Sequence, residues 1–278
     1  MSGRSEVIGL VRLAAAPIWV GVLAMGTASA QAPAAGFAYT AARLDCASFE
    51  EHSRARLDAE TGTRLRRETL TRDGVWRMRA RAASAAIRLE AWYDSLALTR
   101  ESVEGTLAPD TDGLLGGRYR GTLTPTGGYT AEARPFVPDE VAEVSELGAA
   151  MDDLLPPLPP VALAVGERWT GRSGLELRRL PDSTAGRRVI RRLELRMRTE
   201  SHRADVRGDT TALPARQVTA EDGQVDWSPA AGFLRRARHI VVETSVPAGG
   251  PLKQPLRSRL EQDVTLERVG EGCQSREP

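Results

Sequence analysis

Most of the chain alternates apolar and polar residues with a period of two. Between 75 and 82, Trp76, Met78, Ala80 and Ala82 occupy one parity, and Arg77, Arg79 and Arg81 occupy the other. Successive side chains of a strand point to opposite faces, so this pattern predicts a strand with one buried face. The segments predicted as strands are 63–72, 75–82, 87–94, 118–123, 129–133, 175–180, 189–200, 209–219, 224–227, 233–246 and 256–269.

Turn residues divide these strands. Asp73-Gly74 is a strong signal for a two-residue hairpin, and 228–232 has the composition of a turn before the long run 233–246. Pro214 interrupts 209–219, which suits an edge strand or a β-bulge because proline cannot donate to a ladder.

A single segment has helical periodicity. Val141, Val144, Leu147, Met151 and Leu154 recur at spacings of three and four. Pro138 suits a first turn, and the acidic residues that follow it suit a helix N-terminus. The pattern therefore predicts an amphipathic helix over 138–155, ended by the proline-rich hinge 156–160.

The order of elements predicts a mainly β (α+β) fold. About 10–12 strands with short connections form a curved antiparallel sheet or half-barrel, with the amphipathic helix packed on it. We expect one domain over 37–273. Its parts are an N-terminal meander (37–137), the helix (138–155), the hinge (156–160) and a C-terminal meander (161–269), and 274–278 is a tail.

The first 30 residues have the organisation of a secretory signal peptide. Arg4 and Arg12 precede an apolar run over 13–25, and small residues then lead to an A-x-A cleavage site that ends at Ala30. A disordered linker over 31–36 should follow. The mature chain is expected to be exported to the periplasm or beyond, and no later stretch is long and apolar enough for a helical membrane span.

The two cysteines, Cys46 and Cys273, lie near the two ends of the expected mature chain. In an oxidising compartment a disulfide between them is the simplest prediction, and two free thiols are the alternative. Because bridged cysteines have Cα atoms within about 7 Å, a bridge would place the first and last strands side by side or nearly so.

The sequence carries no motif for ordinary catalysis. The net charge of +1 does not favour a nucleic-acid partner. The histidines have no metal-ligand spacing, and nucleotide-binding and nucleophile-elbow patterns are missing. We therefore predict no catalytic, cofactor-binding or metal-binding residue. An enzyme would need an acid and a base that meet only in three dimensions, for example a pair such as His239 and Glu243. On one strand these two residues point to the same face about 13 Å apart, which is too far for a hydrogen-bonded pair.

Two groups of motifs carry resemblances. The order of meander, helix and second meander resembles the lipoprotein-carrier half-barrels of the LolA/LppX type. The segment from Pro160 through Gly166-Glu167-Arg168-Trp169, together with 223–227 and 232–234, is similar to uncharacterised exported bacterial β-rich proteins. The carrier resemblance implies a concave apolar face that holds acyl chains.

One helix cannot cover so wide a sheet. A helix of about 17 residues is some 25 Å long and 10 Å wide, whereas ten strands at about 4.8 Å span nearly 50 Å. We therefore expect an apolar groove beside the helix for a lipid-like ligand or an apolar peptide, in a non-catalytic binding or carrier protein. An envelope hydrolase is the alternative. The candidate ligand face consists of Trp76, Met78, Leu193, Leu195, Met197, Leu256, Leu260 and Val264.

Overall fold

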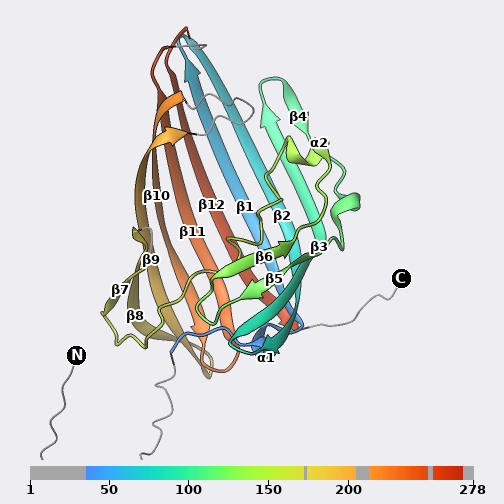
Figure 1. The fold of residues 1–278 in the computed structure, drawn as a ribbon, viewed down its shortest axis with the longest axis vertical. Coiled ribbons are helices and arrows are strands. Elements are labelled where there is room, and N and C mark those ends of the chain that lie inside the picture. Colours follow the sequence, from blue (N-terminus) through green and yellow to red (C-terminus); the bar gives the residue numbers. More distant parts are fainter. Residues whose placement is uncertain (1–35, 172–173, 205–212, 250–252, 272–278) are drawn as a thin grey trace, which may run out of the picture. The chain divides into compact units, whose positions relative to one another are not determined.

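The described residues fold around one twelve-stranded antiparallel sheet that does not close on itself (Figure 1). The computed structural model describes residues 36–171, 174–204, 213–249 and 253–271. The strands are β1 (Ala47–Thr61), β2 (Arg64–Ala83), β3 (Ala86–Ser102), β4 (Gly105–Leu107), β5 (Tyr119–Leu123), β6 (Tyr129–Ala133), β7 (Arg168–Thr170), β8 (Glu176–Ala185), β9 (Arg188–Ala204), β10 (Leu213–Ser228), β11 (Gly232–Val246) and β12 (Leu256–Glu271). The helical elements are short: α1 (Ala41–Leu44), the 3-10 helix η1 (Asp112–Leu114) and α2 (Asp139–Ala142).

The first and last long strands lie side by side at the centre of the sheet. The strand order is β6-β5-β3-β2-β1-β12-β11-β10-β9-β8-β7, and β4 pairs with β3 off this path. Antiparallel pairing of β1 with β12 joins the two meanders into one sheet (Figure 1). The predicted fold class and the adjacency of the terminal strands are thus confirmed.

The disulfide itself stays a prediction, because Cys273 lies outside the described residues. Cys46 directly precedes β1, and the first residue of β1, Ala47, pairs with Glu271 at the end of β12. The predicted signal peptide, almost all of the linker 31–36, and the tail 274–278 also lie outside the described residues. In the part of the chain that the structure describes, no helix is long and apolar enough to cross a membrane.

The predicted hairpin at Asp73-Gly74 is wrong. Both residues lie inside β2, which continues without a turn from Arg64 to Ala83. Gly74 serves close packing, since a Cβ there would come within 3.0 Å of the Tyr93 ring. The actual turn before β2 uses Gly62, whose φ of 60° is in the left-handed region that glycine adopts at little cost.

The predicted helix over 138–155 is also wrong in length. Only Asp139–Ala142 is helical, and separate turns follow, as in the hydrogen bond from Ala150 N to Leu147 O at 3.1 Å. Consecutive turns of three to four residues still bury the whole apolar stripe, including Val141, Leu147 and Met151. A short helix is marginal in water, and packing of these side chains decides the local backbone.

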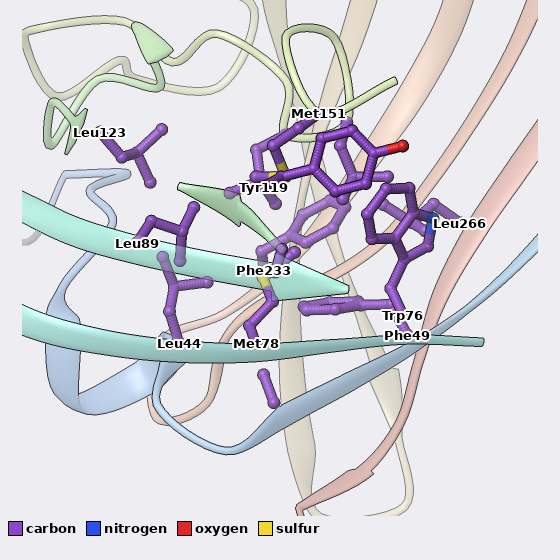
Figure 2. Packing of buried hydrophobic residues seen from close by; sticks show 14 of the residues in the cluster. Leu44, Phe49, Trp76, Met78, Leu89, Tyr119, Leu123, Met151, Phe233 and Leu266 are labelled. Atoms are coloured by element: carbon purple, nitrogen blue, oxygen red, sulfur yellow. The ribbon is translucent and has the colours of Figure 1, made fainter. Parts of the chain in front are cut away.

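Residues 137–163, here called the covering segment, lie over one face of the sheet and close the hydrophobic core. They cross the sheet from the β3–β4 side toward β7 (Figure 1). Figure 2 shows Met151 of this segment beside Tyr119, with Trp76, Phe49 and Phe233 close by. The centroids of the Trp76 and Tyr93 rings are 3.8 Å apart, and those of Trp76 and Tyr119 are 5.3 Å apart.

Hydrogen bonds fix the covering segment to the rest of the core. Tyr119 OH donates to Leu147 O at 2.8 Å, and Leu158 N donates to Thr126 O at 2.8 Å. Within the proline-rich stretch, Pro156 O accepts from Tyr39 OH at 2.9 Å, and Leu158 is buried. The stretch that links the two meanders is therefore packed into the core in an extended conformation.

Candidate functional site

The candidate site is the face of the sheet that carries the core, here called the inner face. The pairing register defines cross-strand rows on this face. One row runs Gly74, Glu51, Leu266, Arg236, Val225 and Leu193 across β2, β1, β12, β11, β10 and β9. The next row runs Arg72, Ser53, Val264, Arg238, Gly223 and Leu195. The inner face can therefore be followed row by row toward the Thr61–Arg64 turn.

The sequence-predicted ligand residues lie on this inner face but differ in exposure. Trp76, Met78, Leu193, Leu195 and Val264 are at most 3% exposed, so protein atoms already fill the space around them. Met197, Leu256 and Leu260 are partly exposed and lie further along the strands. Only these three of the predicted set are open to a ligand.

Beyond the covering segment, the inner face remains apolar and partly exposed. Leu57, Leu260 and Val242 form one row across β1, β12 and β11. We call the partly exposed apolar residues of this region the distal apolar patch: Leu57, Ala59, Leu70, Ile240, Val242, Leu256 and Leu260. On β2 the buried Glu68, which pairs with Arg66, borders the patch. Exposed apolar patches on protein surfaces are candidates for interaction sites.

A layer of polar side chains separates the core from the patch. We call Glu51, Ser53, Arg72, Glu221, Arg236, Arg238 and Gln262 the polar belt. Glu51, only 3% exposed, is its best-connected member. Its carboxylate accepts from Arg72 Nη2 at 2.5 Å, from Trp76 Nε1 at 2.9 Å and from Tyr93 OH at 3.2 Å. These contacts satisfy a charge that would be costly to bury alone.

The Glu51 charge also changes the acidity of its neighbours. Burial is the largest single influence on Arg72 and lowers its pKa. The charge of Glu51, the hydrogen bond to it and the neighbouring Tyr93 and Tyr119 together outweigh burial, so the pKa lies above its usual value. Burial, with Glu51 adding to it, raises the pKa of Tyr93 well above its ordinary range. Arg72 therefore remains a cation and Tyr93 a neutral phenol at physiological pH.

Arg236 and Arg238 form the second part of the belt. Their side chains are 4% and 10% exposed, and both project from β11 on the inner face. Arg238 pairs with Asp153 of the covering segment and lies 3.6 Å from Glu221. Arg236 lies 4.0 Å from Asp153. Burial, followed by the charge of Arg238, lowers the pKa of Arg236 to about 10.

A cleft of about 340 Å³ lies where the belt, the patch and the covering segment meet. This volume is at the lower end of the roughly 300–1,000 Å³ typical of small-molecule sites. The sheet contributes Ser53, Ala55, Leu70, Thr71, Arg72, Arg238, Leu260 and Gln262, and the covering segment contributes Val144, Ser145, Glu146, Ala150 and Asp153. A cleft therefore lies beside the covering segment, but it is not the purely apolar groove that the sequence predicts. Its lining mixes charged, polar and apolar side chains, and the proline-rich hinge 156–160 does not contribute to it.

Sequence reasoning missed the belt. Arg236 and Arg238 share the parity of Ile240 and Val242 along 233–246, and Glu51 shares that of Phe49 and Leu57. Charged residues at core positions of a strand were therefore visible as an irregularity in the alternation. The sequence did not show that these charged residues lie together, because their grouping depends on the register between β1, β2 and β11.

The outer face carries cross-strand ion pairs instead. His239 Nδ1 lies 2.8 Å from Asp263, while Glu243 pairs with Arg259, so these two candidates for an acid–base pair have different partners. His52 and Asp73 make a similar exposed pair at 2.8 Å. Among the described residues, no group of three or more His, Cys, Asp or Glu side chains is arranged to hold a metal ion.

The His52–Asp73 pair gives a testable pH dependence. The hydrogen bond from the Asp73 side chain raises the pKa of His52. Asp73→Asn should therefore lower the pKa of His52 toward the ordinary value of about 6.5, as measured by NMR titration of the ring protons. Because the folded-state pKa is raised, the stabilisation by this pair is present below the unfolded pKa and is lost as pH rises through the folded one.

Asp263→Asn, which removes the partner of His239, is the matched control and should leave His52 unchanged. An unshifted His52 titration in Asp73→Asn would contradict the pairing. The contribution to stability is expected to be small, because both side chains of the pair are more than half exposed.

No protein-family model and no curated protein sequence matches the chain. Among solved structures, the chain is similar to lipovitellin, from a structure described as lipid-protein interactions in lipovitellin, with a TM-score of 0.42 and 7% identity. That match covers 81% of this chain and 25% of the lipovitellin chain, so this chain spans about a quarter of that protein. MucB in complex with MucA(peri) is similar with a TM-score of 0.14 and 9% identity over 81% of this chain and 91% of MucB.

Proposed function

We propose that this chain is an exported, non-enzymatic binding or carrier protein that holds a lipid-like ligand on the distal apolar patch. The observation that carries the proposal is the continuation of the apolar inner face beyond the covering segment, where seven apolar side chains remain partly exposed. The cleft of about 340 Å³ lies where the patch meets the covering segment, and it provides a concave surface that can hold one end of the ligand. The signal-peptide pattern of the first 30 residues supports an exported location.

Physical chemistry favours an apolar ligand there. Removing apolar surface from water contributes roughly 25 cal/mol per Å², and the Leu57–Leu260–Val242 row offers adjacent aliphatic side chains for such burial. These side chains lie on neighbouring extended strands, so the long hydrocarbon chain of a ligand can lie across several of the cross-strand rows. A carrier needs this kind of surface and no reacting group.

The test uses two adjacent residues of β11 that face opposite sides. Val242 belongs to the patch, and Val241 pairs with Ala220 and Glu261 on the outer face. Val242→Asn should weaken binding of the neutral fluorescent probe Nile red by about tenfold, the lower end of the effect of burying a valine side chain (about 1.5–3 kcal/mol), because Val242 is only partly exposed before binding. Fluorescence titration of delipidated protein measures this change.

Val241→Asn is the matched control and should change the affinity by less than about twofold. Equal losses in the two variants would contradict a site on the inner face. Absence of Nile red binding by the unmodified protein, together with no lipid in organic extracts of protein purified from its own envelope, would overturn the proposed function.

A further inference from the structure

The belt contains buried guanidinium groups whose hydrogen bonding is incomplete. The Nε atoms of Arg72, Arg236 and Arg238 are buried and have no hydrogen-bond partner in the described part of the chain. Arg72 and Arg238 line the cleft, and Arg236 precedes Arg238 on the same face of β11. Buried donors of this kind call for an acceptor, because an unpaired one loses its hydration without compensation.

The covering segment supplies the carboxylate that faces the arginine pair of the belt. The strands supply three arginines to this layer but two carboxylates, Glu51 and Glu221. The covering segment adds two carboxylates at the cleft, Glu146 and Asp153. Asp153 is the one that pairs with Arg238 and lies 4.0 Å from Arg236. The Asp153 side chain is 65% exposed, whereas the two arginines are at most 10% exposed. The Asp153 carboxylate thus lies on the solvent-exposed side of Arg236 and Arg238, where the anionic group of a ligand can replace it.

The arginine pair and the patch are continuous along β11. Ile240 and Val242 follow Arg238 on the inner face, about 7 and 14 Å further along the strand. Leu260 lines the same cleft as Arg238 and also belongs to the patch. An anionic group at Arg238 would therefore have aliphatic surface directly beside it.

We propose that the ligand is a long-chain carboxylate, whose head group binds Arg238 and Arg236 in place of Asp153 and whose hydrocarbon chain lies on the distal apolar patch. This inference rests on the proposed function and adds the chemistry of the head group. Guanidinium groups bind carboxylates through charge-assisted, often bidentate hydrogen bonds. Asp153 is then an internal competitor that occupies the arginines when no ligand is bound.

The experiment compares sodium palmitate with 1-hexadecanol, which has the same chain length and no charge, as competitors of Nile red on delipidated full-length mature protein. Palmitate should displace the probe at a concentration about tenfold lower than hexadecanol does, because a hydrogen bond to a charged group has roughly this effect on affinity. Arg238→Gln should remove this preference by weakening palmitate binding about tenfold. Its affinity for hexadecanol should change less than about twofold, which also shows that the variant is folded.

Two further variants and one control test the role of Asp153 and guard against a folding defect. Asp153→Asn should tighten palmitate binding by about fivefold, since it removes the internal anion. Asp152→Asn, whose carboxylate pairs with Arg134 instead, is the matched control and should have no effect. Arg236→Met should weaken palmitate binding with little loss of stability, because it removes a buried charge while the nearest carboxylate, Asp153, is 65% exposed and stays hydrated.

The possible results separate the two proposals. Equal displacement by palmitate and hexadecanol, with Arg238→Gln and Asp153→Asn behaving as the unmodified protein, would overturn the head-group assignment while the proposed function stands. Failure of the unmodified protein to bind Nile red, palmitate or hexadecanol would overturn both.

Discussion

Replacing Glu51 by alanine should lower the free energy of unfolding by about 3–5 kcal/mol, the usual cost of removing one partner from a buried ion pair. The variant leaves Arg72, with a side chain only 17% exposed, without its countercharge. It also removes the acceptor of Trp76 Nε1 and Tyr93 OH at the centre of the core. Urea denaturation at neutral pH, followed by tryptophan fluorescence, measures the change.

The neighbouring residue provides the control. Glu50 lies on the outer face with a side chain 46% exposed, 3.4 Å from His52. Glu50→Ala should change the free energy of unfolding by less than about 0.5 kcal/mol. A similar loss of stability in the two variants would show that β1 does not direct Glu51 into the core.

Leu147→Ala should destabilise the protein by about 2–5 kcal/mol, because it leaves a cavity between the covering segment and the sheet. Leu147 is fully buried, and its carbonyl oxygen accepts the hydrogen bond of Tyr119 OH. The same denaturation experiment measures the effect. The variant should also increase hydrogen exchange in residues 141–158, since the packing of these turns depends on their apolar side chains.

Val161→Ala is the control within the covering segment, because Val161 is 56% exposed. Its free energy of unfolding should remain within about 0.5 kcal/mol of the unmodified protein. If Leu147→Ala proved equally mild, the covering segment would not form part of the cooperative core.

Alternation predicted most of the strands that have one buried and one exposed face. The long strand β1 was not among the predicted segments, and the predicted 209–219 and 224–227 belong to the single strand β10. The faces of 75–82 and 87–94 are as expected, and Trp76 and Tyr93 are buried together. The irregularity predicted around Pro214 appears as a register shift between Pro214 and Gln217. Period-two patterns are reliable here because every long strand has one side against the core or patch and the other against water.

Local signals failed where tertiary packing decides the backbone. Asp73-Gly74 has the composition of a hairpin, yet Gly74 is needed for the close approach of Tyr93. The helical periodicity of 138–155 describes which residues are buried but not the backbone that buries them. The site was foreseen as an apolar surface, and three of its eight predicted residues remain partly exposed. The polar belt could not be foreseen, since strands far apart in the sequence assemble it.

The pairing of β1 with β12 also has a consequence for the order of folding. Ala47 pairs with Glu271, about 220 residues further along the chain, so the middle of the sheet cannot form until nearly the whole chain has been synthesised. Loop closure over such a distance is entropically costly and favours slow folding. Before β12 arrives, β1 and β11 each expose an unpaired edge, which is prone to association with other chains. The final strand therefore acts as a closing element, and a chain that stops before β12 would keep both edges open.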